Sequence, residues 1–200
     1  MTPARPLFAD LQRIGYRPGQ TVFMITVARF TTRDASIECL VQIRDLFFTA
    51  FDETFTEQDW EHVLGGWHVV VGDGDAIVAH AAVVERVLEV AGRPFRTGYV
   101  EGVATHPARQ REGLGSQTMD EVGRLLLSEF EMGALATGVE GFYEGLGWKR
   151  WLGPTYVRYG SDLVRTEEED GGVMVLPFGP SEGIDLSSPL SCPSRSGDDW

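Results

Sequence analysis

The stretch YVEGVATHPARQREGLGS, Tyr99 to Ser116, joins a strand-like run to a helix-like run through a glycine-rich turn. The turn reads QREGLG, Gln110 to Gly115, and its two glycines let the main chain approach an anion with no Cβ in the way. A helix that begins here leaves about four N–H groups unpaired, and its dipole favours negative charge at the same end. The stretch therefore predicts a phosphate-binding loop at the start of a helix.

Two other interpretations of this loop have to be weighed. A dinucleotide-binding fold has G-x-G-x-x-G directly after the first strand of a parallel sheet, with an acidic residue about 20 residues further on. Here the loop comes late in the chain, after several strands joined by short turns, and this order disfavours that fold. The simpler alternative is a glycine-containing turn before an ordinary helix, which the order of the surrounding segments also disfavours.

The segments around the loop alternate between helical and extended patterns. Several short apolar runs in the middle of the chain, joined by turns such as GDGD (72–75), predict an antiparallel meander. The expected elements are, in order, a strand over 22–30, a helix over about 37–51 with apolar positions Leu40, Val41, Phe47, Phe48 and Phe51, a short helix capped by Thr56 and Asp59, separate strands at WHVVV, AIVAHAAVV, RVLEV and 95–105, a helix over about 114–130, a strand over 133–137, a short helix over 140–147 and a strand over 171–177.

Composition narrows the possible classes of protein. With 200 residues, 42% of them hydrophobic, the chain can form one well-cored globular domain. A formal charge of −13 argues against a nucleic-acid partner and fits either cationic partners or simple solubility. No stretch approaches the ~20 apolar residues of a membrane span, and the two cysteines indicate reduced thiols in a cytoplasmic protein. We expect a flexible arm over residues 1–21 and a polar tail over the last twenty residues.

The order of these elements resembles that of the acetyl-CoA-dependent N-acetyltransferases of the GNAT superfamily. Beside the loop, the resemblance rests on GFYEGLGW (141–148), and it extends to the aminoglycoside 2′-N-acetyltransferases through FTEQDWEHVLGGWHVVV, AHAAVVERVL, EEDGGVMVLP and the final GDDW. It covers residues 28–200. The resemblance implies an α+β fold with a mixed central sheet, made of an antiparallel meander and a splayed parallel pair, flanked by helices. We expect one domain over residues 22–200, whose tail contributes to the acceptor site, and a homodimer.

The resemblance assigns the loop to the pyrophosphate of coenzyme A. It also implies that main-chain N–H groups of the strand before the loop hold the pantetheine arm, and that one of them polarises the thioester carbonyl. Arg109 and Arg111 can add positive charge to the loop. None of the four histidines has the spacing of metal ligands, so we expect no metal. The residues expected to bind acetyl-CoA are Val103, Thr105, Gln110, Arg111, Glu112, Gly113, Leu114, Gly115 and Ser116.

Glu101 lies in the strand just before the loop. Side chains alternate along a strand, so Tyr99, Glu101, Val103 and Thr105 share one face. Acetyl transfer requires a neutral amine, and a nearby carboxylate can take the amine's proton directly or through one water. The resemblance implies that Glu101 is this general base. The alternative is a carboxylate that faces solvent.

Tyr143, in GFYEGLGW, is the second catalytic candidate. The coenzyme A sulfur that departs must be protonated or hydrogen-bonded, and a phenol can do either. Enzymes of the family have a tyrosine with this role in the corresponding short helix. Taken alone, an aromatic side chain beside Phe142 is also a plausible core residue.

Acidic residues are expected to bind the acceptor, because aminoglycosides are polycations covered with hydroxyl groups. Three acidic patches qualify: AFDET (50–54), EEED (167–170) and GDDW (197–200). A solvated turn or a frayed chain end would explain the last two equally simply. The residues expected to bind the acceptor are Asp52, Glu53, Glu101, Glu169, Asp198 and Trp200.

We therefore predict an acetyltransferase that modifies an amine, the 2′-amine, of an aminoglycoside antibiotic by direct transfer, which confers resistance. Three departures from the family pattern fall on the acceptor side: Thr54 replaces an acid, the segment before Tyr143 is shorter, and Pro193-Ser194 replaces an acid and an aromatic residue. Kasugamycin or a related aminosugar compound, and a protein or small-molecule amine, are accordingly alternative acceptors. A non-catalytic module that binds coenzyme A is the third class.

Overall fold

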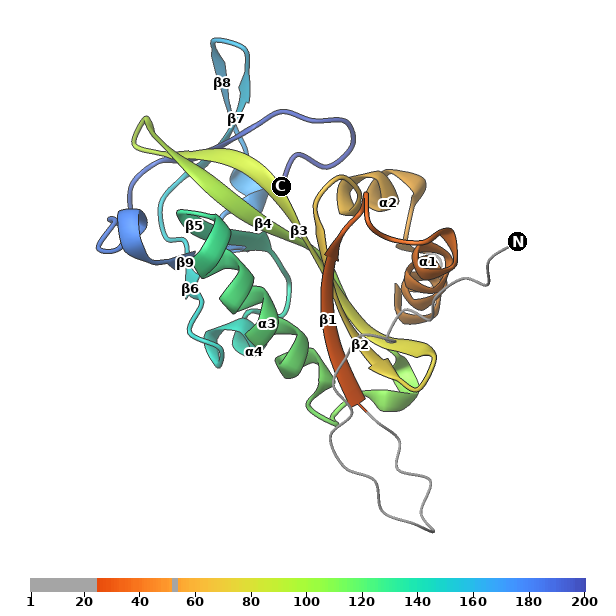
Figure 1. Cartoon of the computed structure of the whole chain (residues 1–200). Helices are drawn as coiled ribbons and strands as arrows, with labels where there is room; N and C mark the ends of the chain where they lie inside the picture. The colour runs from red at the N-terminus through yellow and green to blue at the C-terminus, as the bar shows by residue number, and fades with distance from the viewer. Residues whose placement is uncertain (1–24, 52–53) are drawn as a thin grey trace. The chain divides into compact units, whose positions relative to one another are not determined.

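The computed structural model of the chain describes residues 25–51 and 54–200 (Figure 1). The chain divides into two compact units, the first drawn from residues 1–82 and 102–121 and the second from residues 83–101 and 122–200. The expected arm, the beginning of the first strand, and Asp52 and Glu53 lie outside the described residues. The single domain over 22–200 stays a prediction. Three elements contribute residues to both units: β3 (Ala76–Val90), β4 (Arg93–Thr105) and α3 (Leu114–Glu129).

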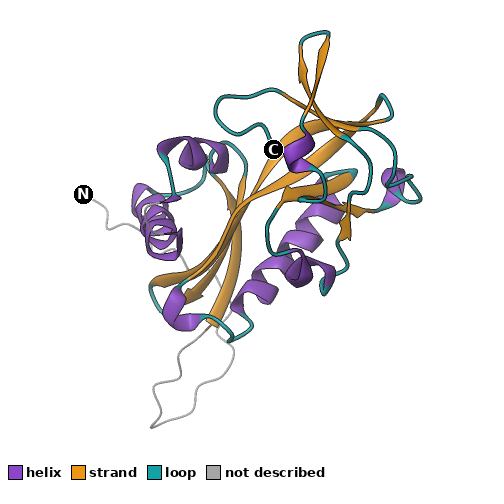
Figure 2. Ribbon diagram, turned by 180° about the vertical axis from the view of Figure 1, so that it is seen from behind, coloured by secondary structure: helices purple, strands orange, loops and turns teal. Residues whose placement is uncertain are grey.

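The first unit contains an antiparallel pair of strands and two helices (Figure 2). Ile25 pairs with Asp73 and Thr31 with Trp67, and the second strand of this pair also pairs with β3. The elements are β1 (Ile25–Thr31), α1 (Ile37–Phe51), α2 (Glu57–Val63) and β2 (Trp67–Asp73).

The beginning of α2 has the predicted capping box. The Thr56 side chain accepts a hydrogen bond from the main-chain N–H of Asp59, and the Asp59 carboxylate accepts one from the N–H of Thr56. Two of the N–H groups that a helix start leaves unpaired are thereby satisfied.

The predicted helix over about 37–51 is present as α1, and its buried face includes only some of the apolar positions that indicated it. Its buried side chains are Cys39, Ile43, Leu46 and Phe47, which recur at helical spacing. Of the predicted apolar positions, Phe47 is fully buried, whereas Val41 and Phe48 are 52% and 45% exposed. The spacing predicted the helix but not its buried face, because α1 carries apolar residues on two faces and the pattern alone does not choose between them.

The second unit is built around a mixed sheet. Its strands are ordered β6-β9-β5-β4-β3-β10-β7-β8. The pairs β4/β5 and β10/β7 are parallel, whereas β5/β9, β6/β9, β7/β8 and β10/β3 are antiparallel. The mixed sheet flanked by helices is therefore confirmed. Its further elements are β5 (Met132–Ala136), α4 (Glu140–Glu144), β6 (Lys149–Arg150), β7 (Thr155–Tyr159), β8 (Asp162–Arg165), β9 (Val173–Pro177) and β10 (Leu190–Pro193).

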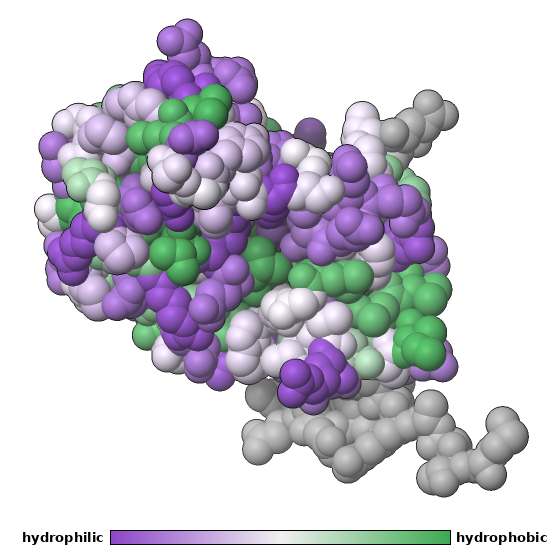
Figure 3. Space-filling model, turned by 90° about the horizontal axis from the view of Figure 1, so that it is seen from above, coloured by the Kyte–Doolittle hydropathy of each residue, from purple (hydrophilic) through white to green (hydrophobic). Residues whose placement is uncertain are grey.

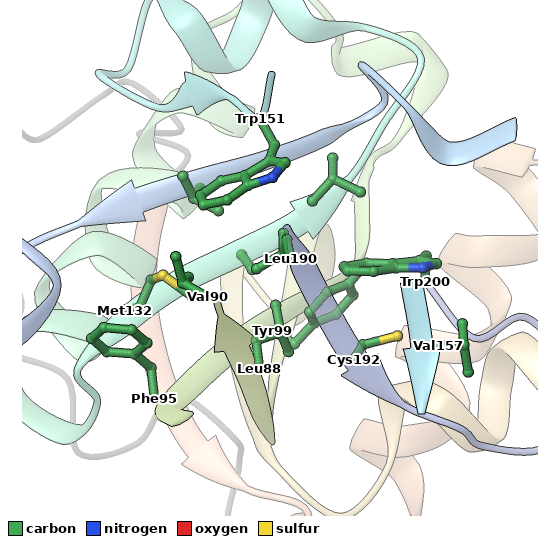
Figure 4. Packing of buried hydrophobic residues seen from close by; sticks show 13 residues of the cluster. Leu88, Val90, Phe95, Tyr99, Met132, Trp151, Val157, Leu190, Cys192 and Trp200 are labelled. Atoms are coloured by element: carbon green, nitrogen blue, oxygen red, sulfur yellow. The ribbon is translucent and has the colours of Figure 1, made fainter. Parts of the chain in front are cut away.

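Two predictions about strands have to be corrected. The segments AIVAHAAVV and RVLEV are not separate strands but form the single strand β3. The last twenty residues are not a loose tail, because β10 pairs with both β3 and β7. Trp200 is only 3% exposed and belongs to the core of the second unit. In Figure 4 its indole lies among Tyr99, Leu190 and Cys192.

The parallel pair β4/β5 is short. Its pairing covers Thr97 to Tyr99 on β4 and Met132 to Ala134 on β5, although β4 itself continues to Thr105. The end of β4, which includes Glu101, thus extends beyond its parallel pairing with β5.

Hydrophilic residues cover much of the face seen in Figure 3, as the charge of −13 leads one to expect, with hydrophobic residues in smaller patches between them. None of the helices in the described part of the chain has both the length and the apolar character that a membrane crossing requires.

Candidate active site

The glycine-rich loop of the first unit connects β4 to α3. After β4, His106 donates its main-chain N–H to the carbonyl of Val78 at 2.9 Å, and its Nδ1 accepts the N–H of Ala108 at 3.3 Å. A short 3-10 helix, η2 (Pro107–Arg109), follows. Arg111 then has φ 66° and Gly113 has φ 80°, so the chain makes a left-handed turn immediately before α3 begins. The predicted position of this loop, at the N-terminus of a helix, is confirmed.

Gly113 has open space where a side chain would stand. A Cβ built on this residue meets no atom within 4 Å. The main chain is therefore uncovered at the point where the helix presents its unpaired N–H groups. This geometry fits a bound phosphate, and an L side chain here would add both bulk and backbone strain.

Arg109 is held in the loop by two carboxylates. Its guanidinium pairs with Glu112 at 2.8 Å and with Asp73 at 2.5 Å. The hydrogen bonds that Arg109 donates, first to Glu112 and then to Asp73, raise the pKa of its guanidinium. Arg109 thus connects Glu112 of the loop to Asp73 of β2. Its positive charge is neutralised by these two carboxylates.

In the second unit, Glu101 forms an ion pair with Arg195, a residue that the sequence analysis did not select. Nη1 of Arg195 lies 2.6 Å from Oε1 of Glu101, and the two side chains are 17% and 16% exposed. Glu101 is therefore not a carboxylate that simply faces solvent. The ion pair also fixes the direction in which the Glu101 carboxylate points.

Arg195 also organises the end of the chain. Its Nε donates to the carbonyl of Asp198 at 2.5 Å, and its Nη2 donates to the main-chain oxygen of Trp200 at 3.0 Å. Its main-chain N–H donates to the Asp199 carboxylate at 2.7 Å. One side chain thus fastens the segment 195–200 to Glu101. The sequence contains one indication that Arg195 has a special role: it is an arginine within an otherwise uncharged or acidic terminal segment.

Tyr99 lies beside this ion pair. Cζ of Arg195 is 5.7 Å from the centre of the Tyr99 ring, and Cζ of Arg86 is 4.8 Å from it. Because Arg195 contacts both Tyr99 and Glu101, these two side chains share a face of β4, as their alternation predicts. Burial, and then the charge of Glu101, raise the pKa of Tyr99 well above its usual value, so its phenol remains neutral.

Two predicted acceptor residues come together in the same unit. Glu169 is half-buried in a short 3-10 helix, η3 (Glu167–Glu169). Burial raises the pKa of Glu169, and the negative charges of Asp198 and then Glu168 raise it further. These carboxylates repel one another, so a cation placed among them would be bound favourably. Asp170, by contrast, pairs with Arg165 and accepts hydrogen bonds from Thr155, which is a structural role.

Tyr143 lies in α4 and is 6% exposed. Its ring makes edge contacts with Phe142 and Trp148 at centroid distances of 5.0 and 6.1 Å. Burial raises the pKa of Tyr143 to about 12, so its phenol keeps its proton at any ordinary pH. It is a hydrogen-bond donor at neutral pH, and it packs as a core residue as well.

Comparison with known proteins decides the family. A model of the acetyltransferase (GNAT) domain matches residues 31–150. The chain belongs to the GNAT acetyltransferases. It is also 38% identical over 173 residues to an aminoglycoside 2′-N-acetyltransferase of Mycolicibacterium fortuitum, a match that covers 84% of this chain and 89% of that protein.

Solved structures agree with the fold of this GNAT acetyltransferase. A GNAT family N-acetyltransferase (YhbS) from Escherichia coli in complex with CoA matches with a TM-score of 0.62 at 12% identity, over 86% of this chain and 92% of that one. A GNAT family acetyltransferase from Brucella melitensis in complex with acetyl-CoA matches with a TM-score of 0.55 at 17% identity, over 80% and 91%. Two longer solved chains are covered only to 33% and 34% of their length.

Family membership confirms three predictions: the GNAT fold, an acyltransferase, and acetyl-CoA as the acetyl donor that these enzymes use. Among residues 25–51 and 54–200, no group of three or more His, Cys, Asp or Glu side chains is placed to hold a metal ion. The individual roles of the site residues stay predictions.

Proposed function

We propose that this GNAT acetyltransferase transfers the acetyl group of acetyl-CoA to the 2′-amine of an aminoglycoside, and thereby confers resistance. The similarity to the enzyme from Mycolicibacterium fortuitum supports this acceptor. The observation that carries the proposal furthest is the network around Arg195, which holds the base candidate Glu101 and the acidic segment 198–200 together. Arg195 thus connects the proposed general base, Glu101, to the acidic segment that would attract a polycation.

For the donor, the loop before α3 would hold the pyrophosphate through main-chain N–H groups at Gly113 and the residues that follow. The N–H groups of Val103 and Thr105, on the part of β4 beyond its pairing with β5, would hold the pantetheine arm. Acetyl-CoA supplies an acetyl group already activated as a thioester.

For the chemistry, Glu101 accepts the proton of the amine, directly or through one water, while the hydrogen bond from Arg195 keeps its carboxylate oriented. Tyr143 donates a hydrogen bond to the departing sulfur, a role that its pKa of about 12 suits because the phenol stays protonated. No side-chain nucleophile is needed, since correct placement of both substrates supplies much of the rate.

For the acceptor, Glu169 and Asp198 would bind ammonium groups of the antibiotic, and the buried Trp200, whose main-chain N–H donates to Asp198, would anchor the chain end. Asp52 and Glu53 belong to the same proposal, although they lie outside the described residues. Kasugamycin or a related aminosugar remains the second candidate, because the departures from the family pattern concern the acceptor side.

Release of free thiol from acetyl-CoA tests the function across gentamicin, tobramycin, kasugamycin and a lysine-containing peptide. We expect turnover with the aminoglycosides. Turnover with kasugamycin alone would identify the second candidate, and turnover with the peptide alone would contradict an antibiotic acceptor. Coenzyme A binding without any turnover would indicate a non-catalytic module.

A homodimer and a cytoplasmic location are further proposals, which light scattering and cell fractionation would test.

Gly113→Val is expected to weaken coenzyme A binding by about 2 kcal/mol or more, because the side chain blocks the open space at the loop and strains a left-handed residue. Gly123→Ala is the matched control: this glycine lies within α3, also with open space around a Cβ, and alanine there should stabilise the helix slightly. Calorimetry that finds equal coenzyme A affinity in both folded variants would defeat the loop assignment.

Glu169→Gln is expected to raise the KM for the aminoglycoside roughly tenfold and to leave the KM for acetyl-CoA unchanged, since one of two neighbouring carboxylates is lost. Glu182→Gln makes the same charge change at an exposed site and should alter neither constant. Because the pKa of Glu169 is raised, its contribution to binding fades as pH falls through that raised value, at higher pH than for an ordinary glutamate. Equal acceptor constants for the two variants would rule out Glu169 as an acceptor ligand.

A further inference from the structure

The first unit contains two fully buried histidines that the proposed chemistry does not use. His68 and His80 are both 0% exposed, and Nδ1 of His68 lies 2.9 Å from Nε2 of His80. At one end, Nε2 of His68 lies 2.8 Å from Oγ1 of Thr32. At the other end, Nδ1 of His80 lies 3.0 Å from the carbonyl oxygen of Gly102. The four residues form one continuous chain of hydrogen bonds that ends on the main chain of β4.

The carbonyl of Gly102 at one end of this chain, together with the neutrality of both rings, determines which ring nitrogens carry a proton. A carbonyl oxygen can only accept, so Nδ1 of His80 must carry a proton. Burial lowers the pKa of His80 to about 3 and that of His68 to about 4, so both rings are neutral and each carries a single proton. Nε2 of His80 therefore accepts and Nδ1 of His68 donates, which leaves Nε2 of His68 as an acceptor facing the hydroxyl of Thr32. The same hydroxyl also lies 3.3 Å from the carbonyl oxygen of Gly66, so the shorter contact, 2.8 Å to His68, is the one assigned to its proton. That hydroxyl oxygen in turn accepts the N–H of Gly65 at 3.0 Å.

The carbonyl at the end of the chain belongs to an unusual residue. Gly102 has φ 53°, a left-handed conformation within a strand. It is covalently joined to Glu101 on one side and to Val103 on the other. A Cβ on Gly102 would lie 2.7 Å from the Phe47 ring and 2.8 Å from Val63. The Phe47 ring also makes an edge contact with the ring of His80, at a centroid distance of 5.0 Å. The Phe47 ring thus lies against both the histidine and the glycine.

We propose that His80 is a positioning residue for acetyl transfer: its Nδ1–H fixes the main chain at Gly102, which sets the direction of Glu101 and of the Val103 N–H. A glycine has the least conformational restriction of any residue, so its carbonyl needs an external hold if its two neighbours are to keep one geometry. His68 and Thr32 hold His80 in the tautomer that can donate. This inference rests on the proposed roles of Glu101 and Val103.

Two variants at one position separate positioning from stability. In His80→Asn the side-chain amide can stand where Nδ1 stands and still donate to Gly102, whereas His80→Leu places a methyl group there. Both variants lose the acceptor for His68, and His80→Leu also leaves the Gly102 carbonyl without its donor, so both should lower the melting temperature, His80→Leu by more. The two are therefore compared at a temperature well below both unfolding transitions. We expect kcat of His80→Leu to fall at least about tenfold below that of His80→Asn, since small misplacements of reacting groups have large effects. The coenzyme A affinity of His80→Leu should also be lower than that of His80→Asn.

Equal kcat and equal coenzyme A affinity in the two variants would overturn the proposal. If wild-type protein acetylates no aminoglycoside, the proposed acceptor fails, but the comparison of coenzyme A affinities still decides the role of His80.

A second measurement does not depend on the variants folding. Nitrogen-15 NMR of histidine-labelled wild-type protein at neutral pH should show His68 and His80 with a protonated Nδ1 and a bare Nε2. His62 and His106 provide the internal comparison. A proton on Nε2 of His80 would remove the donor to Gly102 and contradict the proposal.

Discussion

Glu101→Gln is expected to lower kcat about 100-fold at neutral pH and to leave the KM for acetyl-CoA nearly unchanged. Glutamine keeps the shape of the side chain, and its amide oxygen can still accept the hydrogen bond that Arg195 donates. It cannot take a proton from the amine. As the pH rises, more of the acceptor amine is already neutral, so the need for a base falls and the defect should shrink.

Steady-state kinetics across pH, with saturating acetyl-CoA, measure this effect. Glu85→Gln is the matched control, because Glu85 makes an exposed ion pair with Arg96 in the same unit, and such pairs contribute little. Tyr143→Phe provides the contrast, since it should lower kcat by a factor that does not change up to about pH 10, the phenol being protonated throughout. A wild-type pH–rate profile in Glu101→Gln would place the base elsewhere.

Trp200→Ala is expected to destabilise the protein and to weaken acceptor binding together. Its indole is 3% exposed in the core of the second unit, and its Nε1 donates to Thr166 at 3.2 Å. Replacing a buried tryptophan by alanine costs about 3–5 kcal/mol, which corresponds to a fall in melting temperature of roughly 6–20 °C. The acceptor KM should rise as well, because Arg195 and Asp198 lose the anchor of their segment.

Asp198→Asn separates the two effects. Asp198 is exposed, and its carboxylate accepts the N–H of Trp200 at 3.0 Å, a bond that asparagine can preserve. We expect a raised acceptor KM with an unchanged melting temperature. If calorimetric scans of Trp200→Ala matched those of the wild type, the buried position of the chain end would be wrong.

Local patterns in the sequence predicted the parts of the site that depend on local conformation. QREGLG, with glycine at a left-handed position before a run of helix formers, predicted the loop and the start of α3 at Leu114. Alternation along β4 predicted that Tyr99 and Glu101 share a face. The resemblance to GNAT enzymes then supplied the mixed sheet, which no local pattern determines.

Contacts between distant segments could not be predicted in this way. Arg195 lies 94 positions from Glu101, and no spacing rule connects the two. Trp200 was expected at the acceptor site, and nothing local shows that its ring is also buried in the core. His68 and His80 lie on different strands, and only the pairing of those strands brings them into one chain with Gly102. For α1, two apolar faces compete, and only the packed structure selects one.

The identity of the acceptor amine is tested most directly by two aminoglycosides that differ at a single position. Kanamycin B carries an amine at the 2′ position, and kanamycin A carries a hydroxyl there. With purified protein and acetyl-CoA, we predict thiol release and a singly acetylated product with kanamycin B, modified at the 2′-nitrogen by NMR, and no turnover with kanamycin A. Equal turnover of both compounds, or acetylation of kanamycin B at another nitrogen, would contradict the proposed 2′-N-acetyltransferase.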